Sequence, residues 1–293
     1  METVERALAQ NGPPVYVRKQ IVHNSHVVDE LRERGAVFVG SVEEVPEGGL
    51  VVFSAHGIAP TVRAGAAARA LRTIDATCPL VTKVHAEARR YAAEGYTVVL
   101  VGHAGHEEVE GTMGEAPDSI VLVESVADAE QLQVEDQQRV AYVTQTTLSV
   151  DETREIVAVL HHRFPNLHGP EKEDICYATT NRQQAVKKLL PHVQLLLVLG
   201  SANSSNSQRL VEVARSAGVP AHLIESKRAI DERWLEGVET VGVTSGASAP
   251  EVLVEDLCEW FHGRGVADIR EFSPAEENVV FKLPAELRRR PAA

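Results

Sequence analysis

Short, continuous apolar runs recur along the chain, and each is followed by small or polar residues and then by a segment with helical character. The five runs span residues 51–53, 98–101, 140–143, 195–199 and 241–243. Continuous rather than alternating runs are typical of strands buried on both faces, as in parallel sheets. The runs begin 42 to 55 residues apart, which leaves room for more than one strand–helix unit in each interval. The pattern therefore predicts an α/β fold with mostly parallel sheets and right-handed crossovers.

Start and stop signals for helices lie between the runs. Pro79 stands where a first helical turn can begin, and Gly95 ends the helix predicted over residues 80–94. A Pro or Gly also closes each of the other predicted helices, which span residues 2–10, 151–164, 180–190 and 206–217. In the first of these, no capping side chain precedes Glu2, and Val4, Ala7 and Leu8 share one face.

Composition narrows the class of protein. The chain has 293 residues, which is enough for about two domains or several small units in one body. Its 29 Lys and Arg stand against 42 Asp and Glu, giving a net charge of −13, whereas nucleic acids and anionic membranes are bound by positive surfaces. With 4% aromatic residues there is little surface for stacking bases. We therefore expect neither a nucleic-acid partner nor a membrane partner.

The sequence also bears on the cellular compartment. Met1 leads directly into charged residues, without the basic and apolar regions of a secretory signal. No stretch reaches the 18 apolar residues of a membrane span. Three cysteines are too few for a disulfide framework, which favours a reducing compartment. We expect a cytoplasmic protein.

Polar side chains cluster in the turns after the apolar runs, where ligands bind in open parallel sheets. Lys and Arg are nearly absent there, so neutral donors would have to hold any anion. The alternative for each single residue is that it only caps the helix that follows. The residues concerned are His56, His103, His106, Thr146, Thr147, Ser204, Ser205, Asn206 and Ser248.

The loop over residues 102–111 has the highest density of chemically active side chains. His106 and Glu108 stand two residues apart between glycines and could form a proton-transfer pair. Together with His103 they could equally be zinc ligands. The third interpretation is a polar loop with satisfied side chains.

The cysteines differ in their surroundings. Cys78 and Cys176 each precede a predicted helix, where a thiol is expected to have a lowered pKa and to bind metal or act as a nucleophile more readily. Their spacing of 98 residues excludes a CxxC pair, and a buried inert thiol is the alternative at each position. Cys258 shares a helical stripe with Leu253 and Leu257, which predicts a core residue.

Taken together, these segments resemble one family, 4-hydroxy-3-methylbut-2-enyl diphosphate reductase, also called IspH or LytB. The resemblance covers essentially the whole chain. The matching stretches include Phe-Ser-Ala-His-Gly at 53–57, Asp-Ala-Thr-Cys-Pro-Leu-Val-Thr-Lys-Val-His at 75–85, and the glycine-rich loop at 102–114. They continue with Thr-Gln-Thr-Thr-Leu-Ser at 144–149 and the segments at 15–24, 174–182, 200–207 and 246–250.

The resemblance implies a trefoil of three small α/β domains around a [4Fe–4S] cluster. It implies reduction of 4-hydroxy-3-methylbut-2-enyl diphosphate by two electrons, with loss of its hydroxyl as water, to isopentenyl and dimethylallyl diphosphate. A ferredoxin or flavodoxin would donate the electrons. A diphosphate-binding protein without a cluster is the alternative from another class.

The resemblance also assigns residues. Cys78 and Cys176 would hold the cluster, and Thr146 and Glu108 would handle the substrate hydroxyl and its proton, with Glu108 as the catalytic residue. The loop histidine then serves the diphosphate rather than zinc. The positions that match the diphosphate-binding residues are His23, His56, His106, Ser204, Asn206 and Ser248, with Ser205 beside them.

The chain departs from the family at its start. The family's first cluster cysteine lies in a Gly-(Phe/Tyr)-Cys-Ala-Gly motif. The residue that corresponds to this cysteine would lie about six residues before Met1. We expect in-frame upstream sequence that encodes a strand and this motif. The domains are predicted to span 1–78, 79–173 and 174–267, with 268–293 as a tail that packs back on the body.

Overall fold

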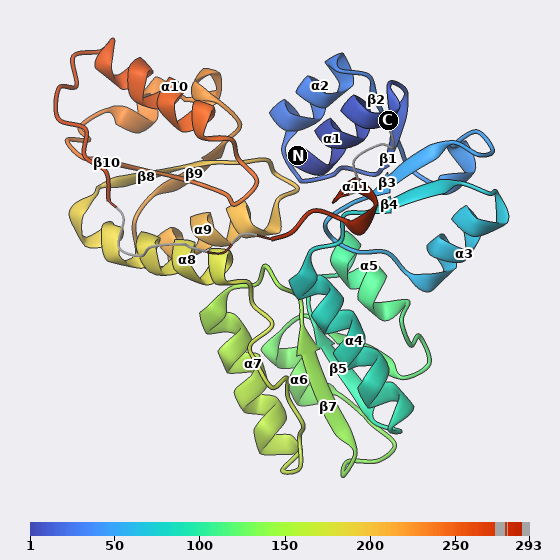
Figure 1. Ribbon diagram of the computed structural model, residues 1–293. Coiled ribbons are helices and arrows are strands. Elements are labelled where there is room, and N and C mark those ends of the chain that lie inside the picture. The colour runs from blue at the N-terminus through green and yellow to red at the C-terminus, as the bar shows by residue number, and fades with distance from the viewer. Residues whose placement is uncertain (273–278, 280, 289–293) are drawn as a thin grey trace. The chain divides into compact units, whose positions relative to one another are not determined.

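The computed structural model describes residues 1–272, 279 and 281–288, and three parallel sheets form its framework (Figure 1). The chain divides into two compact units. Unit 1 holds residues 1–22, 28–176 and 281–288, with two of the sheets, and unit 2 holds His23–Val27 and Tyr177–Val279, with the third. The predicted α/β class with parallel sheets is confirmed.

The first sheet of unit 1 has four strands in the order β2-β1-β3-β4. They are β1 (Val15–Arg18), β2 (Ala36–Val39), β3 (Leu50–Phe53) and β4 (Arg72–Asp75). The helical elements around them are α1 (Glu2–Asn11), α2 (Ser25–Glu33), the 3₁₀ turn η1 (Val42–Glu44) and α3 (Pro60–Ala68). Helix α1 buries Val4, Ala7 and Leu8 and begins without a side-chain cap, as predicted.

The second sheet of unit 1 has the order β6-β5-β7. Its strands are β5 (Thr97–Val101), β6 (Ile120–Val123) and β7 (Val140–Thr144). Helices cover both faces, as Figure 1 shows. They are α4 (Pro79–Ala93), α5 (Glu107–Met113), α6 (Val126–Gln131) and α7 (Val150–Arg163).

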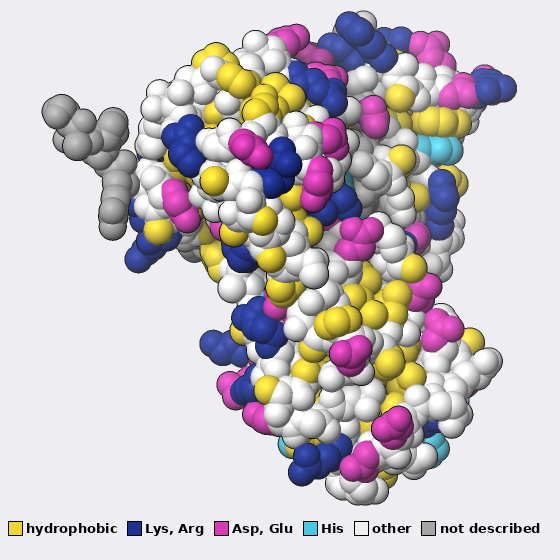
Figure 2. Space-filling view, turned by 90° about the vertical axis from the view of Figure 1, so that its right-hand side faces the viewer, with side chains coloured by type: hydrophobic (Ala, Val, Ile, Leu, Met, Phe, Trp, Pro, Cys, Tyr) yellow, Lys and Arg dark blue, Asp and Glu magenta, His cyan; other side chains and the backbone are white. Residues whose placement is uncertain are grey.

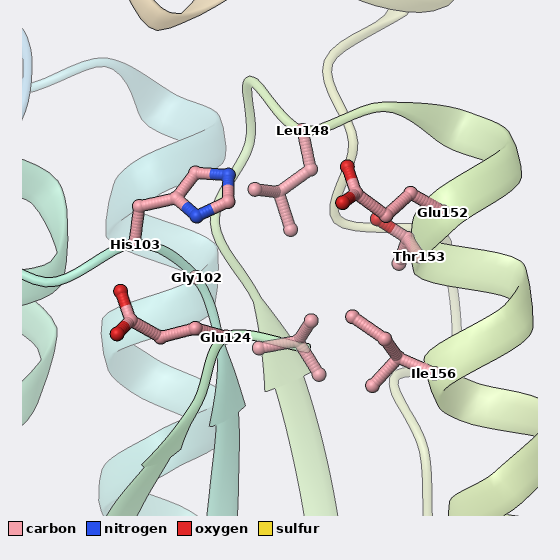
Figure 3. A pocket seen from close by; sticks show the side chains of 8 residues that line it. Gly102, His103, Glu124, Leu148, Glu152, Thr153 and Ile156 are labelled. Carbon is pink, nitrogen blue, oxygen red and sulfur yellow. The ribbon is translucent and has the colours of Figure 1, made fainter. Parts of the chain in front are cut away.

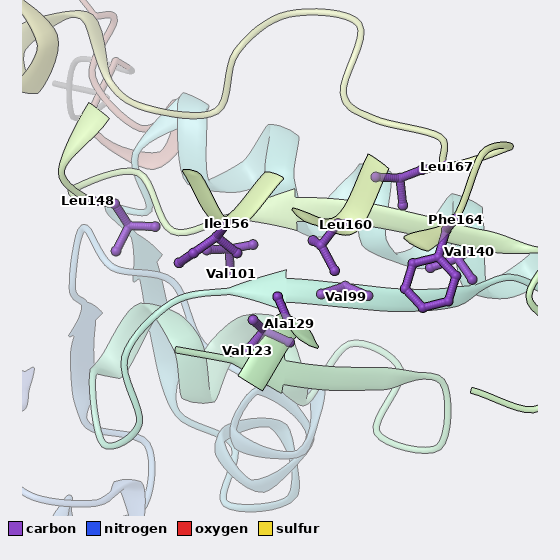
Figure 4. Packing of buried hydrophobic residues seen from close by; sticks show 10 residues of the cluster. All are labelled: Val99, Val101, Val123, Ala129, Val140, Leu148, Ile156, Leu160, Phe164 and Leu167. Atoms are coloured by element: carbon purple, nitrogen blue, oxygen red, sulfur yellow. The ribbon is translucent and has the colours of Figure 1, made fainter. Parts of the chain in front are cut away.

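The central strand β5 explains why its sequence reads as a continuous apolar run. Val99 and Val101 pack with residues of α6 and α7 in the cluster shown in Figure 4. Val98 and Leu100 point to the other face and pack with residues of α4 and α5. Because side chains alternate between the faces of a strand, burial of both faces requires apolar residues at every position.

Unit 2 repeats this arrangement around a sheet with the order β10-β8-β9. Leu195, Leu197 and Leu199 of the central strand pack against α10, whereas Leu196 and Val198 pack against α8 and α9. The strands are β8 (Leu195–Leu199), β9 (Ala221–Ile224) and β10 (Val241–Ser245). The helical elements are α8 (Tyr177–Leu189), η2 (Leu190–His192), α9 (Ser205–Ser216), η3 (Lys227–Ala229), η4 (Glu232–Leu235) and α10 (Glu251–His262).

Some expectations need correction or completion. Cys258, predicted as a core residue, is only partly buried, because the buried stripe of α10 consists of Leu253 and Leu257. The last helix, α11 (Ala285–Arg288), buries Leu287, and the Leu287 carbonyl accepts a hydrogen bond from Gln10 in unit 1. The rest of the predicted tail falls partly outside the described residues, and the predicted domain boundaries stay predictions.

Charged side chains are interspersed on the face drawn in Figure 2, where Lys and Arg lie among Asp and Glu. Exposed ion pairs also occur along the described chain, such as Arg32 with Asp29 and Arg6 with Glu2. Among the described residues, no helix is both long and apolar enough to cross a membrane.

The packing in Figure 4 predicts a large effect of truncating Leu160, which is fully buried on α7. We expect Leu160→Ala to lower the free energy of unfolding by about 2–5 kcal/mol, through lost apolar contact and the cavity left behind. Val37→Ala, at a side chain that is 40% exposed, should change it by less than about 0.5 kcal/mol. Urea denaturation followed by circular dichroism measures both, and equal effects would contradict the assigned core.

Candidate active site

Polar turns follow the carboxyl ends of β3, β5 and β7, as the sequence predicted for a ligand site. In unit 1 these turns meet around the first turn of α5. Ser54, after β3, donates from Oγ to Glu107 Oε2 at 3.3 Å, and Thr146, after β7, contacts Glu108. Two neighbouring carboxylates of α5 are thus bound by turns from the two different sheets of unit 1.

Glu108 is the buried acid of this site, with 1% of its surface exposed. Its Oε1 accepts a hydrogen bond from the backbone N–H of Thr146 at 2.6 Å. Its Oε2 accepts one from the Thr146 hydroxyl at 3.1 Å. The two residues assigned to the substrate hydroxyl are therefore in direct contact, although 38 positions separate them in the sequence.

Burial raises the pKa of Glu108 to about 7. The hydrogen bonds from Thr146 oppose this shift, and the negative charge of Asp174 adds to it. Removing the carboxyl from water penalises its charged form, so a carboxylic acid persists here at a pH where exposed glutamates are ionised. Such a group can release or accept a proton near neutral pH.

His106 caps α5 rather than pairing with the Glu108 carboxylate. Its Nδ1 accepts a hydrogen bond from the Glu108 backbone N–H at 3.2 Å. The Glu108 carboxylate is bound by Thr146, and the proton-transfer pair of His106 and Glu108 stays a prediction. An imidazole that accepts at Nδ1 carries its proton on Nε2, which makes Nε2–H a donor.

His56 lies next to His106, with ring centroids 5.6 Å apart in an edge-to-face arrangement. Its Nδ1 is 3.7 Å from Glu107 Oε2, and both side chains are largely buried. Burial raises the pKa of Glu107, while the charges of Lys19 and Arg18 and the hydrogen bond from Ser54 lower it. The two imidazoles and this carboxyl form one compact polar cluster in unit 1.

Cys78 is the N-cap residue of α4, as its position before Pro79 predicted. The expectation of a lowered pKa is wrong for this thiol. Burial raises its pKa and outweighs the hydrogen bonds from the backbone N–H groups of Leu80 and Val81. The charges of Cys176 and Glu108 raise it further, which places both groups within electrostatic range of the thiol.

The Cys176 backbone N–H donates to the Thr146 carbonyl at 2.9 Å, so this cysteine lies beside the Glu108–Thr146 pair. Two neighbouring thiols at helix starts suit two ligand positions of an iron–sulfur cluster. Within the described part of the chain, no group of three His, Cys, Asp or Glu side chains is placed to hold a metal ion. The zinc interpretation of His103, His106 and Glu108 is therefore not supported among the described residues.

His103 turns away from this cluster. Its backbone N–H donates to Gln145 Oε1 at 3.2 Å. Its side chain lines a small pocket with Glu124, Leu148 and Glu152, as Figure 3 shows. The cavity volume of about 10 Å³ is room for about one water molecule, so this pocket is too small for a substrate.

Unit 2 holds a second set of neutral donors at the start of α9. Ser204 is the N-cap residue, and its Oγ accepts a hydrogen bond from the Ser207 hydroxyl at 2.9 Å. Asn206 is 5% exposed, and neither its amide nitrogen nor its amide oxygen has a hydrogen-bond partner among the residues that the structure describes. A buried amide without partners costs free energy, which marks Asn206 as a group that a ligand would satisfy.

The turn after β10 completes this set. The Ser248 hydroxyl donates to the His23 carbonyl at 3.2 Å, so both predicted residues lie together in unit 2. A Cβ at Gly246 would lie 2.1 Å from Ser207 Oγ and 3.5 Å from Asn206 Nδ2. Glycine at 246 therefore permits the close approach of the turn that carries Ser248 to the start of α9.

Sequence reasoning missed three charged residues near these groups. Arg18 ends β1, a strand the hydrophobic pattern did not reveal, and Lys19 follows it and forms an ion pair with Glu110 at 2.7 Å. Asp174 is buried and affects the pKa of Glu108. A buried aspartate two residues before a candidate ligand is a signal that could have identified it.

Comparison with known proteins agrees with these features. Residues 1–262 match the family described as LytB protein. The chain is 57% identical to a 4-hydroxy-3-methylbut-2-enyl diphosphate reductase of Nocardia farcinica, over 98% of this chain and 86% of that protein. It is 59% identical to the protein of the same name from Acidothermus cellulolyticus, over 99% of this chain and 85% of that protein. These names give no support to a protein that only binds diphosphates.

Solved structures show the same likeness. The E-1-hydroxy-2-methyl-but-2-enyl-4-diphosphate reductase of Plasmodium falciparum superposes with a TM-score of 0.93 at 39% identity, covering 98% of this chain and 91% of that one. A second structure, of (E)-4-hydroxy-3-methyl-but-2-enyl diphosphate reductase, matches with a TM-score of 0.63 at 31% identity, covering 89% and 92% of the two chains.

The raised pKa of Glu108 predicts a pH-dependent stability. In the folded protein Glu108 binds its proton up to about pH 7, whereas in the unfolded chain it releases it near 4.5. The folded state thus holds the extra proton, and its stability should fall as the pH rises from about 4.5 to 7. We expect ligand-free wild type to lose on the order of 3 kcal/mol relative to Glu108→Gln over this range. Parallel pH profiles of the two proteins in urea denaturation would contradict the assignment.

Proposed function

Because the chain belongs to the LytB protein family, we propose that it reduces 4-hydroxy-3-methylbut-2-enyl diphosphate to isopentenyl and dimethylallyl diphosphate in the cytoplasm. The reaction breaks the C–O bond of the allylic alcohol and forms a C–H bond. It consumes two electrons and two protons, and the hydroxyl leaves as water. The observation that supports this function most directly is the buried Glu108 carboxyl, whose pKa of about 7 suits it to protonate a leaving hydroxyl.

In this proposal Glu108 delivers the proton, and Thr146 orients the Glu108 carboxyl. The Thr146 backbone N–H holds one carboxyl oxygen at 2.6 Å, which fixes the direction of the acid. The Thr146 hydroxyl is 3.1 Å from the other oxygen and can rotate to relay a proton between Glu108 and the substrate hydroxyl. Burial of the pair excludes bulk water, so protons reach the reaction centre through these two residues.

The diphosphate is assigned to neutral donors. Asn206 in unit 2 has a buried amide that lacks partners, and its Nδ2 can donate to a phosphate oxygen. In unit 1, the proton on His106 Nε2 makes this ring a donor as well. The other proposed diphosphate-binding residues are His23, His56, Ser204, Ser205 and Ser248.

We assign the thiolates of Cys78 and Cys176 to a [4Fe–4S] cluster. When bound, such a cluster supplies the electrons and a Lewis-acidic iron for the substrate oxygen. The raised pKa of Cys78 means that ligation must displace a proton that burial otherwise retains. A small ferredoxin or flavodoxin is the proposed electron donor.

The proposal predicts a selective defect in Glu108→Gln. The protein is reconstituted anaerobically with iron and sulfide and assayed with a chemical reductant. We expect Glu108→Gln to keep the visible absorbance of the cluster and the affinity for substrate, but to lose about 10²–10⁴ in turnover, because the proton donor is gone.

Glu110→Gln is the matched control, since Glu110 lies on the same helix with a side chain that is 54% exposed. It should retain wild-type turnover. Near-full turnover in Glu108→Gln would show that Glu108 is not the proton donor. Absence of iron and sulfide from every preparation, with diphosphate binding intact, would instead favour the cluster-free alternative.

A separate prediction concerns Asn206. Removing one hydrogen bond to a charged phosphate oxygen costs about 1.5–3 kcal/mol, so Asn206→Ala should weaken substrate binding about 10- to 150-fold. Calorimetric titration without reductant measures this. Asn166→Ala, at an exposed amide bonded to Gln138, should leave affinity unchanged. Loss of cluster absorbance with unchanged affinity in Asn206→Ala would reassign this residue.

A further inference from the structure

A buried ion pair joins the two segments of unit 1 that carry the neighbouring thiols. Lys83 lies on α4, five residues after Cys78, and Asp174 lies two residues before Cys176. Lys83 Nζ donates to Asp174 Oδ1 at 2.7 Å. The Asp174 side chain is completely buried, whereas that of Lys83 is 25% exposed.

Further hydrogen bonds attach the same segment to α4 and to the end of β7. Lys83 Nζ also donates to the Lys172 carbonyl at 2.5 Å. Asp174 Oδ2 accepts a hydrogen bond from the Thr144 backbone N–H at 2.9 Å. Beyond it, the Cys176 N–H donates to the Thr146 carbonyl. Residues 172–176 are therefore held by a helix through Lys83 and by a strand end through the backbone.

Stability alone does not account for this pair. Burying two charges costs about as much as their attraction returns, and apolar residues of similar size often serve a fold as well. The ion pair instead fixes the position of the Asp174 carboxylate, because the two oxygens of this carboxylate are bound by two different elements, α4 and β7. Helix α4 is rigid, and five residues of helix span only about 7 Å, so a shift at Lys83 is transmitted to Cys78.

We propose that the Lys83–Asp174 ion pair is a positioning device that sets the separation of the Cys78 and Cys176 thiols. Its relevance to catalysis rests on the proposed function, in which both thiolates bind the cluster. The separation itself is a property of the polypeptide. Without Lys83, the buried Asp174 carboxylate loses its counter-charge, and residues 172–176 lose the two hydrogen bonds that Lys83 of α4 donates to them.

The test uses phenylarsine oxide, which binds tightly only where two thiols can reach one arsenic atom. It is titrated anaerobically into reduced, metal-free protein. Lys83→Met and Asp174→Asn should each weaken binding about tenfold or more, because chelation depends on how well the site matches the span of the probe. Lys83→Arg, which keeps the charge, should restore most of the affinity. Cys78→Ser should abolish chelation.

Arg90→Met is the matched control. Arg90 lies on the same helix and pairs at 3.7 Å with Glu171, one residue before the segment 172–176. Both side chains are exposed, so this pair is expected to contribute little to the position of the segment. The affinity of Arg90→Met for phenylarsine oxide should stay within about twofold of the wild-type affinity. Circular dichroism verifies that each variant folds. If Lys83→Met is unfolded, the test rests on Asp174→Asn, whose side chain can still accept the hydrogen bond from the Thr144 backbone N–H.

Wild-type affinity in folded Lys83→Met and Asp174→Asn would overturn the proposal, and so would absence of chelation in the wild type. The measurement needs neither cluster nor substrate. Failure of the proposed function would appear differently, as absent turnover in a wild-type protein that still chelates the arsenical.

Discussion

Burial of the Glu108 carboxyl is the constraint on which the rest of the site depends. Helix α5, which carries Glu108, also lies close against the turn that follows β3, and glycines make that approach possible. A Cβ at Gly111 of α5 would lie 3.4 Å from the Gly57 backbone and 3.3 Å from the His85 ring. Gly57 itself has φ +82°, a conformation that other residues rarely adopt. Close packing here excludes water and thereby raises the pKa of Glu108.

The hydrogen bonds to Glu108 lower its pKa, whereas burial raises it, and the balance of the two effects suits the group to proton transfer. Desolvation alone would raise the pKa of the carboxyl further, whereas the two hydrogen bonds from Thr146 favour the ionised form. Because both act, the pKa lies near 7. Thr146 also accepts the Cys176 N–H at its carbonyl, so one residue connects the acid to a candidate cluster ligand.

The hydrophobic pattern predicted three of the four inner strands, but it missed β1, whose burial alternates, and most of the edge strands. Strands β3, β5 and β8 are buried at nearly every position, and each has an unbroken apolar run. The edge strands β2, β4, β6 and β9 are buried at only some positions. Polar residues interrupt β4 and β9, whereas β2 and β6 are apolar throughout and were missed although they carry such a run. Helix ends were predicted more reliably, because proline and glycine act locally, although α8 begins at Tyr177, three residues earlier than expected.

Residue types at strand ends predicted which side chains belong to the site, but not how they pair. His106 and Glu108 are close in sequence, yet the partner of the Glu108 carboxylate is Thr146, from a different strand end. The thiol of Cys78 shows the same limit, because the effect of a helix start is local whereas burial depends on the whole packing around it. Lys83 and Asp174 are 91 positions apart, and their ion pair exists only in the folded protein.

The central claim is that Glu108 in the folded protein titrates with a pKa of about 7, well above its ordinary value of 4.5. Infrared difference spectroscopy between wild type and Glu108→Gln tests it directly, through the C=O stretching band of a protonated carboxyl. The account predicts one such band in the wild type at pH 6, absent from the variant, that disappears with a midpoint near the pKa of about 7. A midpoint near 4.5, the ordinary value for glutamate, or no band at pH 6, would contradict it.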